Sequence, residues 1–423
     1  MAIETWEEAG LIRIGKDFVI GSVKLLPFQN LFIAFDSPQR LLRSDARDYV
    51  MGIGRSSLTL ANLTIRRKSR STLDLGTGCG IQAFLAAEHS DTVFGTDANP
   101  RAIEFARFNA LLNGMKKVIL LGGDLFEPVE GKQFDLILSS PPFVVSPHKS
   151  YFYRDGGDGS EGICERLVRR VPTHLREGGY AQILANWPEK AGKEWSGEVR
   201  RWVEGVGCDT WVLRSESRDA ATYASTWIRH TERGSPAVLA RRFRQWMEYY
   251  ERLGIDALGA GIVNMRRSKG KRTFWFATQE APSKMLGPCG EAIAEGFQVR
   301  DLLEERSTDE ELLILAPVVA PGVRLETRHT KAQEGWTGPE VWVRMTDGLA
   351  YEGRVDSCLA DLLMQLDGRR SLGSLLDGMA EKLGVSRETA SGPFCLIVRQ
   401  LLQQGFLLSQ SLPQKQAGAA TPQ

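Results

Sequence analysis

The sequence is poor in the residue types from which proteins build disulfide frameworks and zinc sites. Its 423 residues include six cysteines and five histidines, widely scattered and without a Cys-x-x-Cys pair. This excludes the usual zinc spacings and predicts reduced thiols and no metal centre. The sequence contains no run of about 18 apolar residues, the length needed to span a membrane. The acidic start, Met1–Glu8, lacks the apolar segment of a signal peptide, so we expect a cytoplasmic protein without a membrane partner.

The chain also lacks an excess of either charge. It has 53 Lys and Arg against 52 Asp and Glu, a formal net charge of +1. A long nucleic-acid track would normally need a clear basic excess, so this balance argues against one while leaving room for a local basic patch. The length is enough for two or three domains, one of them with a full α/β core.

What the sequence does have is a regular alternation of apolar runs and helix-period segments after residue 71. Strands alternating with helices of this length predict right-handed βαβ units, hence a mostly parallel sheet with helices on both faces. The predicted strands are Thr72–Leu75, Thr92–Gly95, Val118–Leu121, Leu136–Leu138 and Tyr180–Ala185; the predicted helices are Ile81–Glu88, Arg101–Asn113 and Gly162–Leu175. Asn113-Gly114 and Gly178-Gly179 are placed to end helices.

A glycine-rich loop, Asp74-Leu-Gly-Thr-Gly-Cys-Gly80, closes the first predicted strand of this alternation. Glycine allows backbone to pass close to a ligand. Asp97 ends the next strand, 17 residues after Gly80, and is placed to accept hydrogen bonds from a ribose diol. Loop and acid together predict a nucleoside-containing cofactor; the alternative is a structural turn.

Two cofactors remain open from these residues. Gly78–Ala83 fits the dinucleotide fingerprint, which keeps an NAD enzyme in consideration. Asp74 argues the other way, since a carboxylate there would repel a pyrophosphate but could orient the cationic methionine part of S-adenosylmethionine. Asp124, after the third strand, is a candidate acceptor for an adenine amine, with Leu125 offering its backbone amide; a turn role for Asp124 is as plausible.

The fourth strand ends in Ser139-Ser-Pro-Pro-Phe143, at the sheet edge where open α/β proteins bind ligands. Proline fixes φ, so the Pro141 carbonyl can be aimed rigidly. That carbonyl and the Ser140 hydroxyl can accept the two hydrogens of a planar amino group, while Phe143 stacks on it. Such a clamp would act by orientation and charge stabilisation. The alternative is an ordinary Pro-Pro turn.

As a set, these segments resemble class I S-adenosylmethionine-dependent methyltransferases of the amino-methylating (N/S)-P-P-(F/Y) group. The similarity extends over about residues 50–215 and is strongest to release-factor glutamine methyltransferases and small-domain rRNA guanine methyltransferases. It implies S-adenosylmethionine as cofactor. The predicted cofactor contacts are Asp74, Gly76, Thr77, Gly78, Cys79, Gly80, Asp97, Ala98, Asn99, Asp124, Leu125 and Ser139; the predicted catalytic residues are Ser140, Pro141, Pro142 and Phe143.

Ser140 departs from the family, which usually has Asn there. A serine hydroxyl is shorter than an amide and must rotate to its acceptor geometry. The leading hypothesis is methylation of a glutamine-type amide in a protein or peptide. The alternatives are the exocyclic amine of an RNA or DNA base, or a cofactor-binding scaffold without catalysis. Nothing in the sequence indicates the oligomeric state.

The resemblance and the composition shifts predict five regions. They are an N-terminal β-rich or substrate-side element (1–55), the methyltransferase domain (56–280), a linker or unassigned region (281–345), a winged-helix-like module (346–410) and a disordered tail (411–423). Tyr151–Gly159 is a candidate lid, with a plain surface loop as the alternative. The cations in Arg266–Arg272 could grip phosphates or could form a solvated hairpin tip.

Overall fold

A computed structural model describes residues 3–8, 11–42, 46–148, 151–156, 162–268, 270, 273–333 and 335–409. The predicted tail 411–423, the cations Lys269, Lys271 and Arg272, and the last part of the candidate lid, residues 157–159, lie outside these residues. The chain divides into two compact units, Met1–Ala281 and Pro282–Gln423, each with buried side chains of its own.

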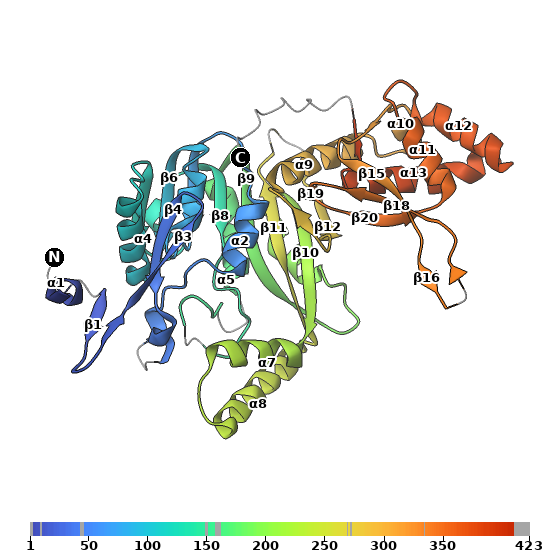
Figure 1. Cartoon of the computed structure of the whole chain (residues 1–423). Helices are drawn as coiled ribbons and strands as arrows, with labels where there is room; N and C mark the ends of the chain where they lie inside the picture. The colour runs from blue at the N-terminus through green and yellow to red at the C-terminus, as the bar shows by residue number, and fades with distance from the viewer. Residues whose placement is uncertain are drawn as a thin grey trace. The chain divides into compact units, whose positions relative to one another are not determined.

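The first unit is built on an eight-stranded sheet with the strand order β12-β10-β11-β9-β8-β5-β6-β7 (Figure 1). Strands β5 to β9 run parallel to their neighbours in that group, and β11 is antiparallel to both β9 and β10. The mostly parallel, Rossmann-like sheet is therefore confirmed. Its strands are β5 (Ser69–Leu75), β6 (Ser90–Asp97), β7 (Val118–Gly122), β8 (Phe134–Ser139), β9 (Leu175–Glu189), β10 (Asp209–Asp219), β11 (Ala257–Arg266) and β12 (Phe276–Glu280).

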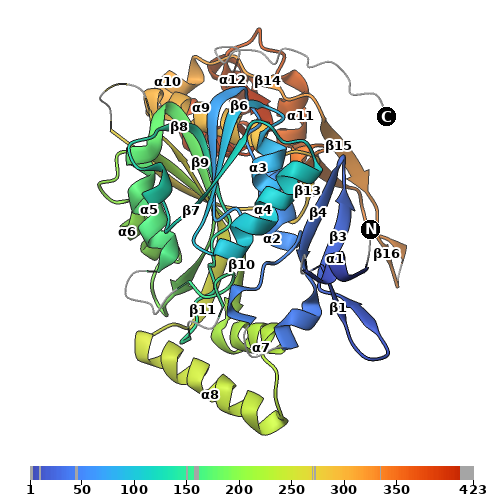
Figure 2. The same cartoon turned by 90° about the vertical axis from the view of Figure 1, so that its left-hand side faces the viewer.

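Helices cover both faces of this sheet, as Figure 2 shows, with α5 and α6 on one face and α2, α3 and α4 on the other. A large buried cluster joins α5 and α6 to the central strands. Central parallel strands are buried on both faces, and residues 72–75 of β5 are accordingly all buried. The helices are α2 (Arg55–Leu63), α3 (Ile81–Ala86), α4 (Pro100–Leu112), α5 (Ile163–His174) and α6 (Gly197–Val203).

Helix α4 begins and ends as its sequence predicts. The Asn99 side chain accepts a hydrogen bond from the backbone N–H of Arg101, and Pro100 occupies the first turn, where its missing N–H costs nothing. Asn113 closes the helix, and Gly114 follows with a φ of +64°.

The pair Gly178-Gly179 does not end a helix, contrary to the prediction. Helix α5 ends at His174, and Leu175 already begins β9, which is much longer than the predicted Tyr180–Ala185. The register between β8 and β9 shifts between Phe134 and Leu136. A Cβ at Gly179 would lie 3.0 Å from the carbonyl oxygen of Asp135, so glycine permits the close approach of backbone at this irregularity.

The N-terminal segment, which was predicted to be β-rich, forms two hairpins, and one of them is tied to α4. They comprise β1 (Ile12–Ile14) with β2 (Val19–Gly21), and β3 (Val23–Phe28) with β4 (Leu31–Asp36). Asn109 of α4 exchanges two side-chain hydrogen bonds with the backbone of Ala34, at 2.8 and 2.9 Å, and also donates to the Cys79 carbonyl at 2.9 Å. A single buried amide thus connects the hairpin, α4 and the glycine loop. Short helices flank the hairpins: α1 (Ile3–Glu8), η1 (Pro38–Leu42) and η2 (Ala46–Asp48).

A helical hairpin, α7 (Ala220–Thr231) and α8 (Pro236–Leu253), connects β10 to β11. It lies at the carboxyl end of β10, clear of the helices that cover the sheet (Figure 2). Asp219 and Ser235 cap the two helices, and Gly254 ends α8 with a φ of +64°. Aromatic side chains, among them Trp246 and Tyr250, bury its inner side against Val144.

The second unit combines α-helices with a small antiparallel sheet. Strands β15 (Val323–Arg328), β18 (Glu340–Met345) and β20 (Glu352–Val355) form that sheet, so much of the unassigned region 281–345 has regular structure. Three helices lie in the region 346–410, which was predicted as a winged-helix-like module, and β21 (Leu407–Leu408) pairs with β14 (Val318–Val319). The other elements are η3 (Glu127–Val129) in the first unit and β13 (Met285–Leu286), α9 (Gly290–Glu305), α10 (Asp309–Leu313), β16 (Lys331–Ala332), β17 (Gly335–Trp336), β19 (Gly348–Leu349), α11 (Ser357–Gln365), α12 (Leu372–Leu383) and α13 (Arg387–Gln403). None of the helices described here is long and apolar enough to cross a membrane.

The basic segment near residue 266 is not a hairpin tip, because β10 lies between β11 and β12. Arg266 is buried and forms a 2.6 Å ion pair with Asp209, which is fully buried. Arg267 donates to the carbonyls of Pro172, at 3.1 Å, and Leu175, at 2.7 Å. Both arginines therefore hold the fold together and are not free to grip phosphates.

Replacing Asp209 with alanine should lower the free energy of unfolding by about 3–5 kcal/mol, because it leaves the Arg266 guanidinium buried without its carboxylate. Urea denaturation measures this. The matched control is Glu216→Ala, which removes the partner of Arg218 in an exposed pair and should cost no more than about 1 kcal/mol. Equal losses in the two variants would contradict the structural role of Arg266.

Candidate active site

A cavity of about 590 Å³ opens at the carboxyl ends of the parallel strands. Strand β5 has β6 on one side and β8 on the other, so the chain connections diverge at this point, where open α/β sheets bind ligands. The cavity wall is drawn from six segments. It comprises Arg47 and Tyr49–Gly52 with Ser56 and Ser57, Asp74–Cys79 with Ile81 and Gln82, Thr96–Asn99 with Ala102, Gly123–Leu125, Ser140–Pro142, and Tyr151–Tyr153 with Asp155, Gly156, Ile163 and Arg166.

The glycine loop takes a tight path that the end of β6 holds in place. The backbone N–H groups of Gly76 and Thr77 both donate to the Thr96 carbonyl at 2.8 Å. Gly76 and Gly78 have φ values of +78° and +55°, which glycine adopts at little cost. A Cβ at either glycine would meet no other atom within 4 Å, so the backbone of this wall is left open to a ligand.

Asp97 joins the loop to the second strand. Its carboxylate accepts from the backbone N–H of Gly78 at 2.9 Å and of Asn99 at 2.8 Å. Burial raises the pKa of Asp97, and these two hydrogen bonds act in the opposite direction. A carboxylate has about four lone-pair positions, so two acceptor positions remain for the hydroxyl groups of a ribose.

Asp74 lies at the inner end of the cavity and is 1% exposed. One carboxylate oxygen accepts from the Thr77 hydroxyl at 2.6 Å and from the Ala83 N–H at 3.0 Å. Burial raises the pKa of Asp74 to about 7, although both hydrogen bonds favour the ionised form. Because burial makes the carboxylate hard to ionise near neutrality, a cationic ligand in the cavity would stabilise it.

Asp124 and Leu125 also reach the cavity, from the loop after β7. Leu125 has a φ of +49°, a left-handed conformation that is uncommon for a residue with a branched side chain. Its side chain is buried, which fixes the turn. Asp124 forms a 3.1 Å pair with Arg166 in which both side chains are about half exposed, so this pair contributes little to stability.

The segment after β8 divides into structural and cavity-lining residues. The Ser139 hydroxyl donates to the Leu75 carbonyl at 2.7 Å and joins β8 to β5 from a fully buried position. Ser140, Pro141 and Pro142 line the cavity. Within the described part of the chain, the Ser140 hydroxyl has no hydrogen-bond partner, so it is available to a ligand bound in the cavity.

Three of the sixteen predicted site residues do not reach this cavity wall: Gly80, Ser139 and Phe143. Gly80 faces the Phe84 ring, and a Cβ at this position would lie only 2.4 Å from the ring, closer than any side chain tolerates. Phe143 lines a separate cavity of about 110 Å³ and packs against the core. Its predicted stacking on the acceptor group therefore remains a prediction.

The sequence reasoning expected a β-rich or substrate-side element at 1–55 but named none of its residues as part of the site. Arg47, Tyr49 and Met51 line the cavity although they precede the parallel sheet. Tyr49 meets Tyr153 edge-on, with ring centroids 5.5 Å apart, and the Arg47 guanidinium lies 4.8 Å from the Phe152 ring centroid. The aromatic run at 151–153 was a usable signal, whereas nothing in the local sequence around Tyr49 indicates its partner.

Metal ligands do not gather anywhere in the described ranges: no three His, Cys, Asp or Glu side chains are arranged to hold an ion. The cavity wall instead includes four aspartates (Asp74, Asp97, Asp124 and Asp155), an open glycine backbone and the Ser140 hydroxyl. Its volume lies within the range of about 300–1,000 Å³ typical of cofactor and ligand sites.

Comparisons with known proteins agree with this geometry. The family described as "Methyltransferase small domain" matches residues 53–194, and a "Domain of unknown function (DUF7782)" matches residues 294–409. A "Putative protein N5-glutamine methyltransferase" of Methanocaldococcus jannaschii is 36% identical over 136 residues, which is 30% of this chain and 68% of that protein.

Two further relatives are matched over smaller shares of their length. A release factor glutamine methyltransferase of Xylella fastidiosa is 33% identical over 29% of this chain and 49% of that protein. A ribosomal RNA small subunit methyltransferase C of Alcanivorax borkumensis is 30% identical over 28% of this chain and 33% of that protein. The chain thus spans between one third and about two thirds of the curated relatives it matches.

Fold and site together define a class I S-adenosylmethionine-dependent methyltransferase. The chain belongs to the methyltransferase small-domain family. The residues present fit the cofactor: Gly76 and Gly78 leave backbone open, Asp97 retains acceptor positions, and Asp74 is a carboxyl group in the cavity wall whose ionised form a cation would favour. S-adenosylmethionine supplies an electrophilic methyl group on a cationic sulfur.

Binding of S-adenosylmethionine should strengthen as the pH rises through about 7. Asp74 is half protonated near pH 7 in the free protein, and a cation favours its ionised form, so binding at pH 6 requires a proton to leave. Isothermal titration should give a Kd about tenfold weaker at pH 6 than at pH 8. The amino group of the cofactor titrates too, and Asp74→Asn is the control for it. Equal pH slopes in wild type and variant would contradict this role of Asp74.

Proposed function

We propose that this protein methylates the side-chain amide of a glutamine in a protein or peptide. The observation that carries the choice of substrate is the N5-glutamine methyltransferase relative, more than two thirds of which aligns with this chain at 36% identity. Peptide recruitment by the proposed winged-helix-like module, 346–410, is in keeping with it. We also propose that the protein works in the cytoplasm.

In this proposal Ser140 and Pro141 orient the acceptor. Both line the cavity that holds the glycine loop and Asp97. The Ser140 hydroxyl and the Pro141 carbonyl accept the two N–H hydrogens of the amide, which directs the nitrogen lone pair toward the methyl group. A carbon–nitrogen bond forms as the carbon–sulfur bond breaks, and the nitrogen then loses one proton to water. Orientation of this kind contributes to rate without any covalent intermediate on the protein.

The direct test is transfer of labelled methyl from S-adenosylmethionine to separate pools of protein, RNA and DNA. Label should enter protein and be recovered after digestion as N5-methylglutamine. Ser140→Ala should reduce kcat about tenfold, the effect of losing a hydrogen bond worth roughly 1–1.5 kcal/mol, with the cofactor Kd unchanged. Label confined to RNA or DNA would overturn the glutamine assignment. No transfer to any pool would favour a cofactor-binding scaffold.

One observation favours the second candidate, a nucleic-acid base. Residues 229–244, around the turn between α7 and α8, contain five arginines and one glutamate. Within the described part of the chain, no ion pair joins these arginines to a carboxylate, and four of them are exposed: Arg229, Arg233, Arg241 and Arg244. Exposed, unpaired arginines are suited to phosphate contacts, although solvation of the helix surface accounts for them equally well.

A variant with Gln at Arg229, Arg233, Arg241 and Arg244 separates these alternatives. If phosphates bind there, the slope of log affinity for RNA against log salt should fall by roughly 0.7–0.9 for each phosphate that is no longer neutralised. The control replaces four exposed cations near the amino ends of β5 and β7, on the opposite edge of the sheet: Lys68, Arg70, Lys116 and Lys117. Equal slopes in the two variants would argue against a nucleic-acid acceptor.

A further inference from the structure

The segment that follows the Ser140-Pro-Pro clamp folds back on itself beside the cavity. We name residues 144–148 and 151–156 the acceptor loop. The backbone N–H of Val144 donates to the Arg154 carbonyl at 3.0 Å, and the N–H of Gly156 donates to the Val144 carbonyl at 3.1 Å. The two arms of the loop are therefore joined directly next to the clamp.

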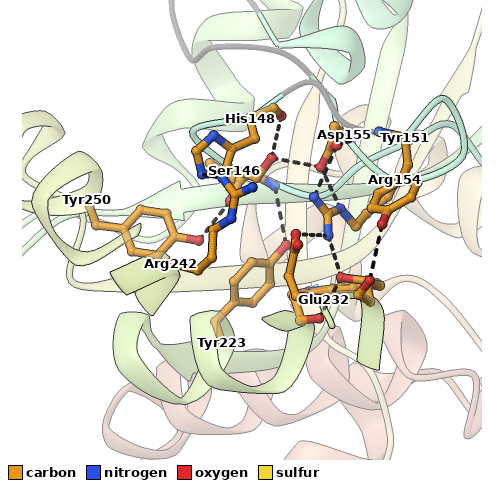
Figure 3. Close-up of polar contacts among 12 residues, drawn as sticks. Ser146, His148, Tyr151, Arg154, Asp155, Tyr223, Glu232, Arg242 and Tyr250 are labelled. Carbon is orange, nitrogen blue, oxygen red and sulfur yellow. Dashed lines mark hydrogen bonds and ion pairs between the residues drawn. The ribbon is translucent and has the colours of Figure 1, made fainter. Parts of the chain in front are cut away.

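Arg154 is a buried cation at the centre of this loop, as Figure 3 shows. Its side chain is fully buried. Nε donates to Asp155 at 2.6 Å, and Nη1 donates to Glu232 at 3.0 Å and to the Thr231 hydroxyl. The guanidinium also lies over the ring of Tyr151, 4.8 Å from its centroid. These contacts connect the loop to the end of α7, where Thr231 and Glu232 lie.

Asp155 links this cation to other residues of the loop. It accepts from the Ser146 hydroxyl at 2.8 Å and from the Tyr151 N–H at 2.9 Å (Figure 3). The other arm is held separately, because Tyr250 of α8 donates its hydroxyl hydrogen to the Val145 carbonyl at 2.7 Å. The α7–α8 hairpin thus holds both arms of the acceptor loop through buried polar contacts.

The loop in turn sets the position of the clamp. Tyr151, Asp155 and Gly156 line the main cavity. Gly156 packs so closely on the clamp that a Cβ there would lie 2.5 Å from the Pro142 carbonyl oxygen. A displacement of Asp155 and Gly156 would therefore move the backbone that presents Ser140 and Pro141.

Stability alone is a weak explanation for such a cluster. A buried charge is costly to desolvate, and well-packed apolar residues of similar size often serve stability as well or better. What a fork of fixed donors supplies is geometry, because several hydrogen bonds with set directions define one position of the loop.

We propose that Arg154 is a positioning residue for methyl transfer: it ties the acceptor loop to the end of α7, and through Asp155 and Gly156 it fixes the clamp. This inference rests on the proposed function for its kinetic readout. A misplacement of about 1 Å can lower turnover about a hundredfold. Arg154 does not line the cavity, so the affinity for the cofactor should change far less than turnover.

The experiment compares Arg154→Met, Arg154→Lys and Glu232→Gln with wild type, using whichever pool wild type labels. Arg154→Met should lower kcat about a hundredfold while the Kd for S-adenosylhomocysteine changes less than threefold. Arg154→Lys keeps the charge but loses the planar fork, so it should recover the melting temperature more fully than kcat. Glu232→Gln removes only one charge at the edge of the cluster, so it still tests the inference if Arg154→Met fails to fold.

The matched control is Arg266→Met, which breaks a buried ion pair at the opposite end of β10 and β11. It should lower the melting temperature without changing the kcat of the folded fraction. If the Arg154 variants lose no more kcat than this control at equal folded fraction, Arg154 is purely structural and the inference is wrong.

Hydrogen exchange tests the inference without any methyl acceptor. In Arg154→Met, and more weakly in Glu232→Gln, backbone amides of the acceptor loop should exchange at least tenfold faster than in wild type. Amides of the Gly76–Gly80 loop should be unchanged. Unchanged exchange in the acceptor loop would overturn the inference, whereas a protein that methylates no pool would overturn only the proposed function.

Discussion

The Asp97 carboxylate is the interaction on which the geometry of the site depends. It accepts one hydrogen bond from Gly78, in the loop after β5, and one from Asn99, at the start of α4. Asn99 then caps α4, and Asn109 of the same helix reaches the Cys79 carbonyl and the N-terminal hairpin. Without this carboxylate, the glycine loop and the start of α4 would lose the group that joins them, and the site would lose its ribose acceptor.

Local sequence was sufficient to predict the parallel half of the first unit. The glycine loop, Asp97 and the Asn99–Pro100 cap each depend on neighbours close in sequence, so their residue types alone indicate strand, turn and helix start. The limits of β9 were mispredicted because the irregular pairing with β8 that Gly179 allows depends on a strand some forty residues away.

The remaining features depend on contacts between distant segments. Tyr49 meets Tyr153, and Arg154 meets Glu232, across separations that no periodicity reveals. Arg266 shows the opposite error, since its position in a basic run suggested an exposed cation, whereas Asp209 on a neighbouring strand pairs with it in the core. Phe143 lines the smaller cavity in this structure, and its predicted stacking on the acceptor group stays a prediction.

Cations surround the α7–α8 hairpin in two contrasting environments. On its inner side, Thr231 and Glu232 receive the buried guanidinium of Arg154, whose charge is met by two carboxylates. Near the turn, four exposed arginines have no carboxylate partner among the described residues. A buried, paired charge holds its neighbours in a fixed geometry. An exposed charge instead attracts an approaching anion through a field that salt screens. The hairpin therefore combines a rigid support for the acceptor loop with a surface able to attract an anionic partner, and the acceptor's own charge decides whether that surface contributes to recognition.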